Sequence, residues 1–267
     1  MADQPIILWN NLLAQVTAYA FTAGVEGEGS LLSDAWTWDT LRPAYPVTDL
    51  NGDLVIVFDL PTTVAEAEAV ILGAHRRDAV GSRFVGGNVQ IEAWTGAWTS
   101  VLNTAISAAV NEASFHSLAA HTLADNGGKY QYRMTLSSLG LMSTAEIPEM
   151  FLGPVLTMDY ILHGSDPAND VTKASAFEAE SGRRFETIHY TRFEDKFNWD
   201  EILPSAYPPI DTFRKQHLNA KKPFWWLWMP DSAPLECYLV RDMSKAPRMP
   251  TSTGMRRSLR LNMVEAV

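Results

Sequence analysis

The sequence of 267 residues has a single cysteine, Cys237, which excludes an intramolecular disulfide and a zinc site built from several cysteines. A chain without disulfides suits a reducing compartment. Basic residues are also few, since 21 Lys and Arg stand against 31 Asp and Glu, giving a formal net charge of −10. General nucleic-acid binding needs a basic face that neutralises phosphates. We therefore expect no nucleic-acid partner.

Long apolar runs are also missing. No stretch approaches the roughly 18–20 apolar residues that a membrane-spanning helix needs. The aromatic run at 223–230 is too short, and Pro230 ends it. The first residues, "MADQPIILWNNLLAQ", lack the basic region that begins a signal peptide. We expect neither a membrane span nor a signal peptide.

The motifs of several enzyme classes do not occur. The sequence has no G-x-S-x-G, H-E-x-x-H, Walker A or G-x-G-x-x-G pattern. His116 and His121 are five positions apart, which does not place them on one face of a strand or helix as a metal pair. We expect no catalytic residues, no metal and no cofactor. A glycan-degrading enzyme remains an alternative, and it would need two carboxylates brought together in a cleft.

The composition indicates a folded chain with two parts. Hydrophobic residues make up 46% and charged residues 19%. Residues 1–160 carry 6 basic and 17 acidic side chains, whereas residues 161–267 carry 15 and 14. The polar segment "HGSDPANDVT" (163–172) lies between them. We predict a domain of residues 1–162 and a second domain of residues 163–267.

The first part reads as short strands separated by turn segments. "LVIVFDL" (54–60) is a continuous apolar run, while "VQIEAW" (89–94) and "YQYRMTLSS" (130–138) alternate. The spacers "DLNGD", "VGGN" and "DNGGK" carry turn residues. This pattern predicts a mainly β fold whose N-terminal domain is an antiparallel β-sandwich.

The second part has a different order of elements. A long hairpin is predicted to turn at Ser181-Gly182, followed by a helix at 208–218 with Asp211 as its N-cap. Strands are expected at 221–230, 236–242 and 256–266. The pattern predicts a compact α+β unit.

The segment "KKPFWWLWMP" (221–230) places four aromatic residues within five positions. As a strand it would have two apolar faces, with Phe224, Trp226 and Trp228 on one face and Trp225 on the other. Our hypothesis is that one face packs on the helix and the other on a neighbouring subunit, since tryptophan is favoured at interfaces. The alternatives are a strand buried wholly within one chain and a sugar-binding platform.

The first part resembles galactose-binding-like (discoidin-type) β-sandwiches over about residues 5–155. The segments that carry this resemblance are "LLSDAWTWDTLRPAYP" (31–46), "EAVILGAHRRD" (68–78), the "x-W-T-x-V" hairpin and the "Tyr-x-Tyr-x-Arg" strand. The resemblance implies a jelly-roll topology. Tryptophan supplies a stacking face and arginine a fork of donors. A sugar site at the loop ends is expected to use Trp36, Trp38, Arg42, His75, Arg76 and Arg77.

The second part resembles tail and baseplate proteins of long-tailed bacteriophages. "GRRFETIHYTRFEDKF" (182–197), "KKPFWWLWMPD" (221–231) and "SLRLNMVE" (258–265) carry this resemblance. Distal tail proteins are similar in kind, although their ring-forming domain usually comes first. The resemblance implies a small β-barrel with one flanking helix as an oligomerising domain.

These resemblances imply a non-catalytic virion protein of a phage tail tip. It would form a six-fold ring where the tail tube meets the baseplate, beside tube, hub, tape-measure and receptor-binding proteins. Its sandwich would contact such partners or a host glycan. It would be assembled in the host bacterial cytoplasm and reside in the virion tail. The alternative is a monomeric carbohydrate-binding protein or an accessory module of a glycan-active system.

Overall fold

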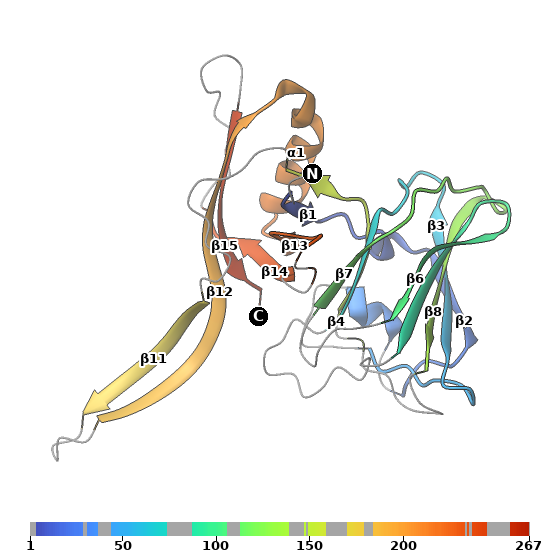
Figure 1. The fold of residues 1–267 in the computed structure, drawn as a ribbon, viewed down its shortest axis with the longest axis horizontal. Coiled ribbons are helices and arrows are strands. Elements are labelled where there is room, and N and C mark those ends of the chain that lie inside the picture. Colours follow the sequence, from blue (N-terminus) through green and yellow to red (C-terminus); the bar gives the residue numbers. More distant parts are fainter. Residues whose placement is uncertain are drawn as a thin grey trace.

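A computed structural model describes residues 4–28, 31–36, 44–73, 87–105, 113–138, 147, 149–158, 170–178, 184–232, 234, 237–244 and 257–266. Over these residues the chain is mainly β, and its strands form three antiparallel sheets (Figure 1). The predicted fold class, an N-terminal antiparallel β-sandwich followed by a unit with one helix, is confirmed.

Two of the sheets form the sandwich. The larger has the order β2-β3-β8-β5-β6, with bounds Ala18–Ala23, Leu54–Pro61, Lys129–Ser137, Asn88–Trp94 and Trp98–Ala105. The smaller has the order β7-β4-β9, with bounds Ala113–Ser117, Ala69–Gly73 and Glu149–Gly153. Short 3-10 helices lie at η1 (Leu12–Gln15) and η2 (Leu32–Trp36). In β3 buried and partly exposed residues alternate, as expected for a strand with one face in a core.

A single buried side chain fixes the entry of the chain into the sandwich. Asn11 caps η1 by accepting from the backbone N–H of Leu13. The same amide donates to the carbonyl of Met150 and accepts from the N–H of Leu152. Because Asn11 is buried, these bonds tie η1 firmly to β9.

The third sheet has the order β10-β1-β13-β14-β15-β12-β11. The bounds are Leu156–Thr157, Ile6–Leu8, Phe224–Leu227, Cys237–Asp242, Arg257–Glu265, Arg184–Ile202 and Asp170–Glu178. Over the described residues the predicted β-barrel takes the form of a sheet with edges at β10 and β11. β1 and β10 come from residues 1–162, so membership of this sheet does not follow the predicted boundary at 162.

The predicted helix is present. It comprises η3 (Pro204–Ala206), α1 (Tyr207–Phe213) and a π-helical turn η4 (Arg214–Leu218). Ile210, Phe213 and Leu218 are buried against the seven-stranded sheet, as their spacing predicts. The prediction of Asp211 as N-cap was wrong. Asp211 lies inside the helix, where its carboxylate pairs with the cations three and four residues later.

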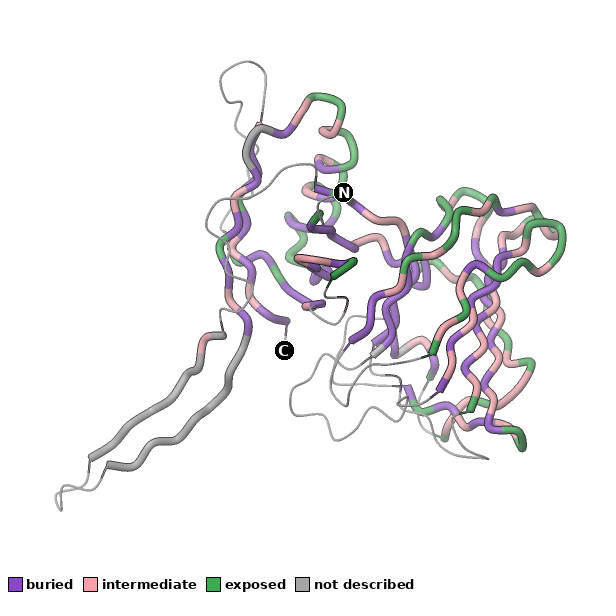
Figure 2. The backbone as a smooth tube through the Cα atoms, viewed as in Figure 1, coloured by how far each residue is buried: buried purple, intermediate pink, exposed green. Residues whose placement is uncertain are grey.

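The aromatic strand β13 is buried on both faces within one chain. Phe224 and Trp226 pack with the helix and β12, while Trp225 and Leu227 pack with residues of β4 such as Ile71. The exposed fractions of Phe224, Trp225 and Trp226 are 0–1%. The chain is therefore layered as five-stranded sheet, three-stranded sheet, seven-stranded sheet and helix. Figure 2 shows the buried residues continuing from the sandwich into the third sheet.

This burial corrects the hypothesis of a subunit interface at Phe224, Trp225, Trp226 and Trp228. The first three have no surface left for a second subunit. Trp228 is partly exposed and packs against the edge of the core that contains Trp226. The alternative of a strand buried wholly within one chain describes β13.

The predicted hairpin is confirmed as β11 and β12. β12 pairs with β15 from Glu194 to Ile202 and with β11 from Arg184 to Phe193. In Figure 1 the β11–β12 hairpin extends away from the rest of the molecule. The predicted turn at Ser181-Gly182 lies outside the described residues.

Candidate functional site

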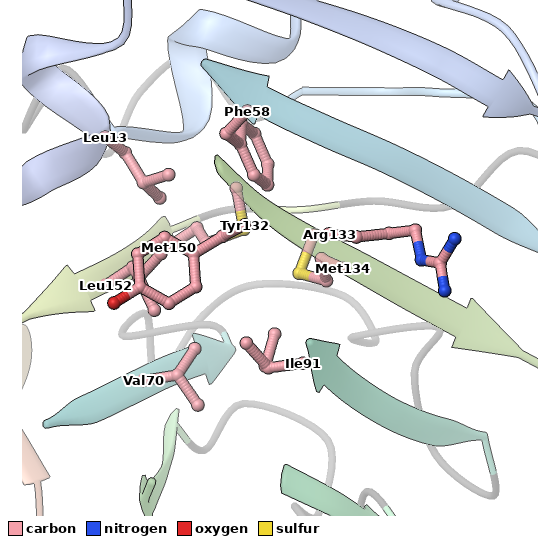
Figure 3. A pocket seen from close by; sticks show the side chains of 9 residues that line it. All are labelled: Leu13, Phe58, Val70, Ile91, Tyr132, Arg133, Met134, Met150 and Leu152. Atoms are coloured by element: carbon pink, nitrogen blue, oxygen red, sulfur yellow. The ribbon is translucent and has the colours of Figure 1, made fainter. Parts of the chain in front are cut away.

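The interior of the sandwich has no room for a ligand at its described cavity. That cavity measures about 10 Å³ and is lined mainly by apolar side chains, including Phe58, Ile91 and Met134 (Figure 3). A cavity of this size holds about one water molecule. The guanidinium group of Arg133 points away from the cavity, toward the outer face of the five-stranded sheet (Figure 3).

The outer face brings aromatic and charged side chains together from neighbouring strands. In β5 the residues Val89, Ile91 and Ala93 are buried, so Glu92 and Trp94 occupy the opposite face. The register places Glu92 opposite the β8 residue Arg133. It also places Trp94 opposite Trp98 across the β5–β6 hairpin. These four residues, Glu92, Trp94, Trp98 and Arg133, are called the aromatic surface below.

The two tryptophans form an edge-to-face pair at the end of the hairpin. Their ring centroids are 5.4 Å apart and their planes meet at 77°. The turn between them is tight because Gly96 adopts φ +100°, a conformation that L side chains rarely adopt. Both indoles are partly exposed. The hairpin therefore holds two aromatic rings at a fixed position beside solvent.

An ion pair fixes the polar half of the aromatic surface. The Nε atom of Arg133 lies 2.5 Å from Oε2 of Glu92, and the two side chains are 30% and 11% exposed. The Cζ atom of Arg133 lies 4.6 Å from the ring centroid of Trp98, in cation–π geometry. The carboxylate and the indole thus hold the guanidinium from two sides. The remaining N–H donors of Arg133 therefore point in a fixed direction, set by its contacts with Glu92 and Trp98.

A chain of hydrogen bonds borders the aromatic surface on β3 and β8. Asp59 accepts from the Nζ atom of Lys129 at 2.5 Å and from the Nε2 atom of Gln131 at 2.6 Å. Gln131 in turn accepts from Asn126 at 2.5 Å. The described face therefore continues from aromatic rings into amide and carboxylate groups.

This arrangement suits a ligand with an apolar ring face and hydroxyl groups at its rim. The C–H bonds of a pyranose carry a slight positive charge and are attracted to the negative face of an indole. Arg133 covers one side of Trp98, so a sugar ring would stack on the remaining exposed indole surface. Glu92 accepts hydrogen bonds from hydroxyl groups and Arg133 donates to them.

Of the sugar residues predicted from the sequence, the structure describes Trp36, which lies apart from this surface. Trp36 is only 5% exposed and packs edge-to-face with Tyr19 and Phe58 at centroid distances of 5.8 and 5.9 Å. It is a core residue, which corrects its assignment as a stacking platform. The other predicted residues, Trp38, Arg42, His75, Arg76 and Arg77, lie outside the described residues.

The residues of the aromatic surface were missed as a site, although the sequence held part of the signal. The alternation of "VQIEAW" already places Glu92 and Trp94 away from the core. These two residues lie beside Arg133 because β5 pairs with β8, and this pairing joins segments about forty residues apart. Spacing along one strand does not supply that register.

The buried titratable groups act as structural elements. Burial lowers the pKa of His217 to about 4, and its ring lies between Trp9, Phe213 and Phe224. Burial also raises the pKa of the Cys237 thiol, which makes its reactive thiolate form rare. Among the described residues no group of three or more His, Cys, Asp and Glu could hold a metal ion. No helix in the described ranges is long and apolar enough to cross a membrane.

No protein-family profile matches this sequence, and no curated protein matches it. Solved structures to which part of the chain shows similarity include the family 32 carbohydrate-binding module from C. perfringens NanJ in complex with galactose. It has 12% identity and a TM-score of 0.37, and the match covers 55% of this chain and 98% of that chain. A Streptococcus pneumoniae fucose-binding module, SpX-3, has 14% identity and a TM-score of 0.38, with 55% and 98% coverage.

The lectin domain of Lectinolysin complexed with Lewis B antigen has 10% identity and a TM-score of 0.37, with 54% and 96% coverage. Each of these matches spans about half of the present chain. At these identities and TM-scores the likeness assigns neither a family nor a ligand to the chain.

Proposed function

We propose that the chain is a non-catalytic carbohydrate-binding protein whose sandwich binds a glycan on the aromatic surface. The observation that carries the proposal is the grouping of Trp94 and Trp98 with the Glu92–Arg133 pair on a partly exposed sheet face. Cross-strand aromatic pairs also stabilise a hairpin, so the pair by itself does not point to a ligand. The charged pair adds a hydrogen-bond acceptor and a fork of donors beside the rings.

The test is binding of the full chain to a glycan array, followed by calorimetric titration with the best glycan. Replacing Trp94 or Trp98 by alanine is expected to reduce affinity at least tenfold, because the stacking surface is lost. Tyr45→Ala is the matched control, since Tyr45 is 39% exposed and lies outside this surface. Its affinity should stay within twofold of the wild type.

A charge variant, a check of folding and two possible outcomes complete the test of the proposal. Glu92→Gln keeps both rings and removes the carboxylate charge, so its affinity reports what the charged half of the aromatic surface contributes to binding. Each variant is checked by circular dichroism for an unchanged fold. Wild-type affinity in both tryptophan variants would reject the aromatic surface as the site. A wild-type chain that binds no glycan on the array would reject the function.

A second candidate is a subunit of a larger assembly, such as the phage tail ring that the sequence resemblance implies. The observation in its favour is the β11–β12 hairpin, which extends from the molecule and ends the sheet with edge strand β11 (Figure 1). An isolated two-stranded hairpin is marginally stable, and a free edge can pair with a strand of another chain. A cyclic arrangement of copies would satisfy such edges.

Light scattering across a range of protein concentrations tests this candidate. A closed oligomer that becomes a monomer when residues 172–190 are replaced by a short turn would support it. A strict monomer at every concentration, with or without those residues, would remove it.

A further inference from the structure

An open groove lies on the face of the seven-stranded sheet that is turned away from the helix. Its volume is about 370 Å³, within the range of small-molecule sites. Residues from β12 and β15 and one residue that follows β14 line it. They are Lys196, Phe197, Asn198, Ser244, Arg260, Leu261 and Asn262. We call this the basic groove.

The strand register fixes the polar floor of the basic groove. Lys196 pairs with Asn262, and Asn198 pairs with Arg260. Alternation places these four side chains on one face of the sheet, while the side chains between them are buried in the core. The Nε atom of Arg260 donates to Oδ1 of Asn198 at 3.3 Å. The two cations therefore lie diagonally across a strand pair, with an amide beside each.

The buried carboxylate of Asp242 fixes Ser244, one of the residues that line the basic groove. The carboxylate of Asp242 is 1% exposed, and its Oδ1 atom accepts from the N–H and hydroxyl of Ser244 at 3.1 and 2.6 Å. The same oxygen accepts from the backbone N–H of Asn262 at 3.0 Å. Lys221 lies 3.6 Å from the other oxygen of Asp242. The carboxylate of Asp242 therefore pairs with Lys221 inside the protein, and its hydrogen bonds hold Ser244 at the groove.

The positive charge of the basic groove is not compensated in the part of the chain that the structure describes. Neither Lys196 nor Arg260 forms an ion pair there, and no carboxylate lines the groove. Glu194, on the same face two residues before Lys196, is not among the lining residues. Like charges on neighbouring strands repel each other. An anionic group held between Lys196 and Arg260 would remove this repulsion.

The size and the neutral groups of the basic groove limit the chemical class of ligand that it can bind. A water molecule occupies roughly 30 Å³ in the liquid, so the groove exceeds what a single small inorganic ion fills. Asn198, Asn262 and Ser244 offer donors and acceptors that match hydroxyl groups. The ring of Phe197 is buried against Trp226 on the other side of the sheet, so it offers no stacking face to a nucleobase.

We propose that the basic groove binds an acidic sugar residue of a glycan. Lys196 and Arg260 hold its carboxylate, and the two asparagine amides with the Ser244 hydroxyl bind its ring hydroxyls. This site lies on a different sheet from the aromatic surface and does not depend on it. Its ligand differs from that of the aromatic surface in carrying a charge, which makes its binding sensitive to salt.

The test titrates the full chain with tetragalacturonate, with its fully methyl-esterified form, and with inorganic phosphate. The two saccharides share a backbone and differ in charge. We expect tetragalacturonate to bind at least tenfold more tightly than the ester at low salt, and this difference to shrink at high salt. Inorganic phosphate is expected to bind at least tenfold more weakly than tetragalacturonate.

Three variants assign the binding to the groove. The double variant K196Q/R260Q is expected to bind tetragalacturonate no more tightly than it binds the ester. Asn262→Asp adds a carboxylate to the groove and should abolish the preference. Arg241→Gln is the matched control, because Arg241 is exposed on the neighbouring strand β14 and does not line the groove.

The outcomes separate this inference from the proposed function. Equal binding of acid and ester, or unchanged binding by K196Q/R260Q, would overturn the groove as an acidic-sugar site. Phosphate binding as tight as that of the saccharide would show an ion site without sugar recognition, which also overturns it. Trp94→Ala should leave tetragalacturonate binding by the groove unchanged, so failure of one site does not imply failure of the other.

Discussion

Replacing Trp225 by alanine is expected to destabilise the monomer strongly. The indole is 0% exposed and shares a core with Ile71, Phe151 and Leu239, which come from both the sandwich and the seven-stranded sheet. A buried tryptophan covers about 150–250 Å², and burial contributes about 25 cal/mol per Å². These values give about 4–6 kcal/mol. Measured replacements of Phe or Trp by alanine cost about 3–5 kcal/mol, so we expect a loss of about 4 kcal/mol.

The assay is urea unfolding followed by tryptophan fluorescence and by far-ultraviolet circular dichroism, with the mass measured by light scattering. Because Trp225 joins the two parts, both probes should report one transition at a lower urea concentration. Trp98→Ala is the matched control. Trp98 is partly exposed, and its cation–π contact contributes only about 0.5–1 kcal/mol.

One result would refute this reasoning. If Trp225→Ala changed the mass of an oligomer while leaving the unfolding midpoint of the monomer unchanged, the side chain would act between subunits. The burial of β13 within one chain would then not describe the protein in solution.

Three other predictions concern pH, backbone packing and the aromatic surface. Burial lowers the pKa of His217 to about 4 from an ordinary value of 6.5. The unfolded chain therefore takes up a proton first, and about 3 kcal/mol of stability, complete above pH 6.5, is lost as the pH falls toward 4. A His217→Gln variant should lose correspondingly less between pH 7 and 4.5 in denaturant titrations, and an equal loss would contradict the assignment. In Gly153→Ala the new Cβ atom would lie 2.3 Å from the carbonyl oxygen of Asn10, so we expect a loss of about 1–3 kcal/mol by calorimetric melting; an unchanged melting temperature would show that the backbone moves freely there. Glu92→Gln should cost about 1–3 kcal/mol, because Arg133 loses a charged partner at a mostly buried position; a loss that disappears in high salt would mean that the pair is effectively solvent-exposed.

Strand alternation and helix periodicity were sufficient to predict the main elements. β3 was predicted from a continuous apolar run and β8 from alternation, which its burial follows from Tyr132 onward. Ile210, Phe213 and Leu218 share a helix face that meets the core. These are local properties, because each depends on the spacing of residues within one segment. The fold class follows from them.

Residue spacing within one segment could not predict that β1 belongs to the seven-stranded sheet. Its three residues, Ile6–Leu8, pair with Trp225–Leu227 more than two hundred positions away. A run of three apolar residues is too short to define a period. The pairing is decided by tertiary packing, since Ile7 enters the core beneath the helix while Leu8 enters the core shared with β4.

The aromatic run led to the hypothesis of a neighbouring subunit because, as a strand, it has two apolar faces. The strand β4, "AVILG", has the same property, with Val70 facing the sandwich core and Ile71 facing the other way. A strand whose two faces are apolar needs cover on both sides. Two such strands in one chain can cover each other, and here Ile71 and Trp225 belong to the same core cluster. The remaining faces are covered by the five-stranded sheet and by the helix. The partner that the aromatic strand required was therefore present in the same sequence, so a chain should be searched for a second strand of this kind before a neighbouring subunit is invoked.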